Sequence, residues 1–191
     1  MLGELPCRRG CHRCCIGPFA ITTLDVAALT QGMASLATDL RQDIQDVARR
    51  QVETMEKAFP RLQKTPVLND WSDGEVDLIV ERFADLPCPA LGSDGSCRVY
   101  PFRPVTCRAM GIPVEEGGIV HGACEVQTAV PIVKLPRALR DEEDQLATVE
   151  AIAMQPMSDE ALLPYGFLSP TLPKASPVAS ILDTGAKGML M

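Results

Sequence analysis

Eight cysteines are the residues of this 191-residue chain with the most evident chemistry, and they fall into two groups. The first group lies in the stretch CRRGCHRCC and contains Cys7, Cys11, Cys14 and Cys15. The second is more widely spaced and contains Cys88, Cys97, Cys107 and Cys124. The Cys11-x-x-Cys14 spacing is the usual one for wrapping two thiolates around one ion. Chelation of a soft metal accounts for all eight positions.

Other roles of thiols explain this pattern less well. The stretch CRRGCHRCC is too polar for the buried core, where a cysteine acts as a small apolar side chain. Disulfides need an oxidising compartment, and the adjacent Cys14 and Cys15 would bridge each other only with strain. A thioredoxin-like thiol pair is expected near a βαβ pattern, which the sequence lacks. A thiol redox protein is therefore an alternative hypothesis rather than the first one.

The number and kind of metal centres stay open at this point. Cys14 and Cys15 are neighbours and cannot easily both reach one tetrahedral ion. Eight thiols suit two four-cysteine zinc sites, or one cuboidal iron–sulfur cluster with the remaining thiols around a second ion. The ferredoxin spacing C-x₂-C-x₂-C-x₃-C-P is absent, so a cluster would not be ferredoxin-like. His12 and His121 each lie beside a cysteine and are further candidate ligands.

Arginines accompany both cysteine groups in an otherwise acidic chain. Thiolates around a metal leave a negative site, and neighbouring cations favour the metal-binding thiolate form. We therefore expect these arginines to compensate the negative charge of the metal site. Binding of an anionic substrate is the alternative role. The arginines beside the first group are Arg8, Arg9 and Arg13, and those beside the second are Arg98, Arg103 and Arg108.

Composition excludes several other functions. A net charge of −7 and a pI near 4.9 argue against a protein that binds nucleic-acid phosphates or a basic membrane anchor. No segment approaches the roughly 18 consecutive apolar residues of a membrane span. The N-terminal sequence also lacks the apolar stretch of a secretory signal. The expected location is the cytoplasm, where thiols stay reduced.

The residues between the two cysteine groups, 22–86, read as a helical insert. Thr22-Thr23-Leu24-Asp25 resembles a capping signal that starts one helix. A second helix is predicted over 35–59 and ends before Pro60, and a third lies within 70–86 after a turn at Asp73-Gly74. In the second helix, apolar or core-facing positions recur at three- and four-residue steps, namely Leu36, Leu40, Ile44, Val47, Gln51 and Met55.

The second cysteine group reads as turns and short elements. Asp94-Gly95 predicts a tight hairpin, and Gly117-Gly118 predicts a second turn within 112–121. Between them, a short helix is predicted over residues 103–110. A last helix is predicted over 136–154, with the acidic run 141–144 as a solvated face.

The expected fold is mainly α with short β-hairpins, a small helical domain organised around a cysteine-rich metal site. The cysteine-cluster domain spans 5–155. The proline-rich residues 156–191 are expected to form an irregular C-terminal tail.

The chain resembles the YkgJ-type cysteine-cluster family, whose domain is described as zinc- or iron-chelating. The resemblance covers roughly residues 5–125 and is most specific in the run DGSCRVYPFRPVTCR. Three residues separate Cys7 from Cys11, where the family pattern Cys-x-x-Cys-x-x-Cys-Cys has two. The resemblance implies that Tyr100, Pro101, Arg103, Pro104 and Arg108 shape the surroundings of the site. It implies the following chelating set: Cys7, Cys11, Cys14, Cys15, Cys88, Cys97, Cys107 and Cys124.

The leading hypothesis is a cytoplasmic metal-binding protein that holds iron, as an iron–sulfur cluster such as [4Fe–4S], or Zn²⁺. A flagellin lysine methylase carries a similar cysteine cluster and is thought to hold an iron–sulfur centre. This similarity favours iron over zinc. The alternative is a metal-dependent protein-modifying enzyme of that type. The sequence contains no nucleophile elbow, phosphate loop or dinucleotide fingerprint, so it assigns no catalytic residue and no protein partner.

Overall fold

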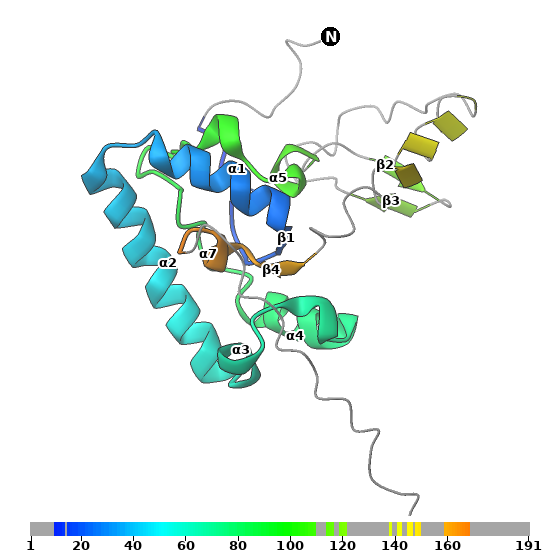
Figure 1. The fold of residues 1–191 in the computed structure, drawn as a ribbon, viewed down its shortest axis with the longest axis horizontal. Coiled ribbons are helices and arrows are strands. Elements are labelled where there is room, and N and C mark those ends of the chain that lie inside the picture. Colours follow the sequence, from blue (N-terminus) through cyan, green and yellow to red (C-terminus); the bar gives the residue numbers. More distant parts are fainter. Residues whose placement is uncertain are drawn as a thin grey trace, which may run out of the picture.

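The computed structural model describes residues 10–13, 15–109, 114–116, 119–121 and 159–168, and positions 138, 141–142, 145–146 and 148–149. Most of these residues are helical, which confirms the mainly α prediction (Figure 1). The α-helices are α1 (Thr23–Ala34), α2 (Thr38–Ala58), α3 (Arg61–Lys64), α4 (Asp73–Arg82), α5 (Val105–Ala109) and α7 (Leu163–Gly166). Two 3₁₀ turns are η2 (Leu68–Asp70) and η3 (Tyr100–Phe102). The strands are β1 (Ala20–Thr22), β2 (Val114–Glu116), β3 (Ile119–His121) and β4 (Glu160–Leu162).

Helix α1 begins where the capping signal predicts. The Thr22 hydroxyl accepts a hydrogen bond from the Asp25 N–H at 3.3 Å, and the Asp25 carboxylate accepts one from the Thr22 N–H at 3.0 Å. This capping box satisfies two of the backbone donors that a helix start leaves without partners. The helix buries Val26, Leu29 and Met33 as its apolar spacing predicts.

Helix α2 confirms the long helix predicted over 35–59, with a later start at Thr38. It ends at Ala58, two residues before Pro60, which precedes α3. Its buried face includes Ala48 and Val52, whereas Leu40 is 36% exposed. The apolar stripe therefore differs from the predicted one by a small rotation around the helix.

Helix α4 confirms the helix expected within 70–86, but the turn predicted at Asp73-Gly74 is wrong. Both residues lie in the first turn of the helix. The Ser72 N–H and the Ser72 hydroxyl each donate to Glu75 Oε2 at 2.9 Å, and these bonds lower the pKa of Glu75. A capping box thus starts the helix and outweighs the turn preference of Asp-Gly.

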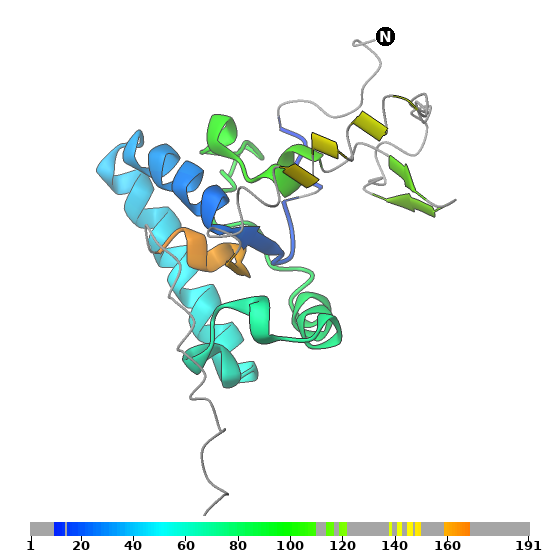
Figure 2. The ribbon, with the colours of Figure 1, turned by 45° about the vertical axis from the view of Figure 1, so that its right-hand side comes forward.

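The prediction of an irregular tail from residue 156 is wrong for residues 159–168. Strand β4 pairs antiparallel with β1, with Ala161 opposite Ile21, and α7 packs against both α1 and α2 (Figure 2). Leu162 and Leu163 are buried. Pro164, one of the prolines of the predicted tail, lies in the first turn of α7, where proline is tolerated. Residues 169–191 lie outside the described part of the chain.

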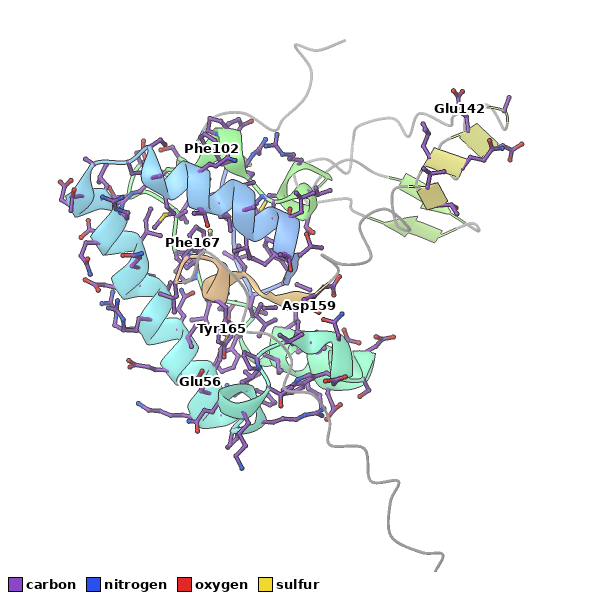
Figure 3. All side chains as sticks on the ribbon, in the orientation of Figure 1. Glu56, Phe102, Glu142, Asp159, Tyr165 and Phe167 are labelled. Atoms are coloured by element: carbon purple, nitrogen blue, oxygen red, sulfur yellow. The ribbon has the colours of Figure 1, made fainter. Side chains whose placement is uncertain are left out.

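A polar contact also holds α7 on α2. The Tyr165 hydroxyl donates to Glu56 Oε1 at 3.2 Å, and the two side chains point toward one another (Figure 3). Burial, followed by the neighbouring Glu56 carboxylate, raises the pKa of Tyr165 above its ordinary value. Tyr165 therefore stays protonated and continues to donate.

The two remaining predicted elements are only partly described. Strands β2 and β3 form the antiparallel hairpin expected within 112–121, and its two glycines lie outside the described residues. Positions 138, 141–142, 145–146 and 148–149 are helical, as predicted for 136–154. Leu146 and Val149 are 65% and 66% exposed, so these apolar residues do not join the core. Asp141 and Glu142 are exposed, as expected of a solvated face.

The packing of residues 159–168 leads to a stability prediction. Leu162→Ala should lower the free energy of unfolding by about 2–5 kcal/mol, because it removes a fully buried side chain and leaves a cavity. Leu78→Ala is the matched control, since Leu78 is 60% exposed and its loss should cost less than about 0.5 kcal/mol. Urea unfolding measures both variants. Equal, small effects would contradict the placement of β4 in the core.

Candidate metal centre

The first cysteine group begins in an irregular segment ahead of β1. Cys11 and Cys15 are half-buried thiols, and the Cys15 N–H donates to the His12 carbonyl at 2.9 Å. Gly10 and Gly17 have positive φ angles of 89° and 76°, so glycine permits both bends of this segment. Cys7 and Cys14 lie outside the described residues.

Backbone pairing brings the two cysteine groups together. The Cys88 N–H donates to the Cys15 carbonyl at 2.8 Å, and the Gly17 N–H donates to the Leu86 carbonyl at 2.7 Å. Between these bonds, Ile16 and Pro87 form an antiparallel bridge. The helical insert therefore returns the chain to the segment it left, and Cys15 and Cys88 become neighbours along paired backbones.

The hairpin predicted at Asp94-Gly95 is confirmed, and it carries Cys97. Leu91 and Cys97 form an antiparallel bridge, and the Ser96 hydroxyl donates to Asp94 Oδ1 at 2.6 Å within the turn. Gly95 has a φ of 76°, the left-handed conformation that such a turn needs.

The tip of this hairpin lies against the first cysteine group. A Cβ atom at Gly95 would lie 2.9 Å from the Gly10 carbonyl oxygen and 3.1 Å from His12 Nδ1. The glycine thus allows the turn to approach the loop that contains Cys11. His12 itself is exposed, with Nδ1 3.3 Å from the Gly10 carbonyl oxygen.

Cys107 lies in α5, which confirms the short helix predicted over 103–110, although Met110 is outside the described residues. The Val105 N–H in the first turn of α5 donates to Asp25 Oδ1 at 2.9 Å. Phe102 of η3 packs on α1 so closely that a Cβ at Gly32 would lie 2.9 Å from Phe102 Cβ. The segment that carries Cys107 is therefore docked on α1.

The two arginines expected near the metal fold back on their own segment. Arg108 donates to the Arg103 carbonyl at 3.0 Å and to the Pro101 carbonyl at 2.6 Å. Arg103 lies over the Tyr100 ring at 3.7 Å and donates to the Tyr100 carbonyl at 3.1 Å. These bonds shape the turn between Cys97 and Cys107. Arg98 forms a looser ion pair with Asp43 of α2, at 3.9 Å.

The described ligand-type side chains do not by themselves complete a metal site. Within the described ranges, no group of three or more cysteine, histidine or acidic side chains lies close enough to hold one ion. Cys88, Cys97 and Cys107 are half-buried thiols, like Cys11 and Cys15. The remaining three cysteines of the predicted set, Cys7, Cys14 and Cys124, lie outside the described residues.

Sequence reasoning missed two side chains that contact the cysteine segments. Asp25 was expected only to cap α1, yet it also binds the first turn of α5. Gln51 was placed on the core-facing stripe of α2, and its amide Nε2 donates to the Pro87 carbonyl at 2.8 Å. A polar residue at a core-facing helical position was the available signal, because buried amides need a partner.

A family model described as "CxxCxxCC: Putative zinc- or iron-chelating domain" matches residues 6–125. No curated protein and no solved structure matches the chain. Among the described helices, none is both long and apolar enough to cross a bilayer.

The contact between the hairpin tip and the first cysteine group is testable at Gly95. Gly95→Ala should destabilise the chain by at least about 1–2 kcal/mol, because the left-handed backbone and the nearby Gly10 carbonyl both oppose a Cβ. Gly74→Ala, where an added Cβ would meet nothing within 4 Å beyond its own helical turn, should be neutral or stabilising by up to about 1 kcal/mol. Chemical unfolding compares the two. Similar effects from both substitutions would contradict the contact.

Proposed function

The chain belongs to this zinc- or iron-chelating family, and we propose that it holds its metal between the two cysteine groups. The observation that supports this most directly is the 2.8 Å hydrogen bond from the Cys88 N–H to the Cys15 carbonyl, which joins the two groups. The proposed ligands are Cys7, Cys11, Cys14, Cys15, Cys88, Cys97, Cys107 and Cys124.

The donor set fits zinc and iron–sulfur clusters alike. Both bind thiolates, and the five described cysteines are half-buried thiols on paired or adjacent segments. Arg103 and Arg108 lie within five residues of one another around Cys107. In the part of the chain that the structure describes, neither forms an ion pair with a carboxylate. Their charge is therefore available to offset a thiolate site.

Iron, as a [4Fe–4S]-type cluster, is our preferred occupant, and zinc is the second. Eight thiols exceed what one tetrahedral zinc ion uses, and adjacent Cys14 and Cys15 favour ligation of different metal atoms. When bound, either group would cross-link segments that are remote in sequence. The proposed location is the cytoplasm, since reduced thiols are needed for chelation.

Metal analysis of protein purified without oxygen tests the kind of centre. We expect iron with acid-labile sulfide and a broad visible absorption from sulfur-to-iron charge transfer. Stoichiometric zinc in a colourless protein would contradict the cluster and support the zinc alternative. Thiols that cycle to disulfides with no bound metal would contradict chelation altogether.

Single substitutions test the ligand set. Cys97→Ser and Cys107→Ser should each reduce metal content and lower the melting temperature, because ligation contributes free energy of folding. Ser93→Ala, an exposed position on the same hairpin as Cys97, should change neither. Full metal content and an unchanged melting temperature in both cysteine variants would show that the assignment is wrong.

A further inference from the structure

Two polar side chains, Asp25 of α1 and Gln51 of α2, are buried in the helical core. Among the described residues, Asp25 and Gln51 are the buried side chains that carry a carboxylate or an amide, with exposures of 6% and 7%. Such groups are costly to bury unless they are hydrogen-bonded. In the described part of the chain, no buried side-chain nitrogen or oxygen lacks a partner. The hydrogen-bond partners of Asp25 and Gln51 therefore show which segments these two side chains hold.

Gln51 binds the segment that holds Cys88. From the buried face of α2, its Nε2 donates to the Pro87 carbonyl at 2.8 Å. Pro87 precedes Cys88 in the chain and is bridged to Ile16, next to Cys15. One amide from the long helix thus fixes the point where the two cysteine groups pair.

Asp25 binds the segment that holds Cys107. Its Oδ1 accepts from the Val105 N–H at 2.9 Å, and its Oδ2 accepts from the Thr22 N–H at 3.0 Å. One carboxylate therefore ties the start of α1 to the start of α5. Cys107 lies two residues beyond Val105, within the same helix.

The two residues act on the backbones of different cysteine segments and by the same means. In each case a side chain of the helical core makes a part-buried hydrogen bond to a main-chain atom within two residues of a cysteine of the second group. If burial were the only requirement, an apolar side chain would suffice at either position. Replacing the polar side chain costs stability only where it leaves a buried partner without a hydrogen bond. Each side chain instead bonds a backbone group of a proposed ligand segment, and Asp25 does so in addition to capping α1.

We propose that Asp25 and Gln51 are positioning residues of the metal centre, with Asp25 setting Cys107 and Gln51 setting Cys88. This inference rests on the proposed chelating function. Neither side chain needs to touch the metal, because each one acts through the backbone that carries a ligand. The thiols are thereby held near their binding positions before a metal arrives, which lowers the ordering cost of binding.

The test uses the full chain with the substitutions Asp25→Ala and Gln51→Met. Two control variants match them. Tyr165→Phe removes a comparable part-buried hydrogen bond, to Glu56, away from the cysteine segments. Thr22→Val removes the hydroxyl that caps α1 and that also donates to Asp25 Oδ2 at 3.1 Å, but it keeps Asp25 Oδ1 as the acceptor for the Val105 N–H. All measurements are made well below each variant's melting temperature.

The first readout is cysteine-resolved alkylation of metal-free protein, followed by mass spectrometry. Gln51→Met should raise the labelling rate of Cys88 roughly tenfold and leave that of Cys107 unchanged. Asp25→Ala should raise the labelling rate of Cys107 roughly tenfold and leave that of Cys88 unchanged, because each substitution loosens one segment. Neither control should change either rate. A uniform rise over all cysteines, or the same pattern in the controls, would overturn the proposal.

The second readout is titration of the metal-free chain with Co²⁺, followed by its thiolate charge-transfer absorption. Both variants should bind Co²⁺ roughly tenfold more weakly and with a weaker band per bound ion, whereas both controls keep the original band. Unchanged affinity and band in Asp25→Ala and Gln51→Met would overturn the positioning role. Failure of the unmodified chain to bind Co²⁺, with selective labelling retained, would contradict chelation of a single divalent ion and support the placement of the two segments.

Discussion

The pairing of residues 15–17 with residues 86–88 is the constraint on which the cysteine site depends. Two backbone hydrogen bonds and one antiparallel bridge close a loop that contains α1, α2 and α4. Closing a long loop costs entropy, although each doubling of its length adds only about 0.6 kcal/mol. The packed helices inside the loop offset this cost, so the helical insert determines where Cys88 lies relative to Cys15.

The helical core itself is completed by a segment from much later in the chain. Strand β4 pairs with β1, directly before α1, and α7 contacts α1 and α2. An isolated pair of three-residue strands would be marginal in water, so burial of Leu162 and Leu163 must stabilise this pair. The family match ends at residue 125, yet the core behind the matched region includes residues 161–163. The cysteine segments are therefore supported by residues beyond the family domain.

Local signals predicted much of this fold, and tertiary contacts account for what they missed. The Thr22 cap and the Asp94-Gly95 hairpin each depend on residues within one turn, and the structure confirms both. Residues 159–168 were misjudged because a short apolar run among prolines has no periodicity, and its partners β1 and α2 are remote in sequence. For the same reason, the cysteine pattern predicted the zinc- or iron-chelating family, whereas the contacts of Asp25 and Gln51 needed the structure.

The apolar contacts indicate that the helical core is stable without a bound metal, whereas the cysteine segments depend more on it. Cys88 and Cys97 pack against the hydrophobic core, so the core holds part of the surroundings of each thiol in place without a bound metal. Small zinc domains that lack such a core fold only with their metal. Here the helices bury their own apolar faces, and a bound metal would mainly stabilise the loops that carry the thiols. Loss of metal should therefore loosen the cysteine segments before it unfolds α1 and α2.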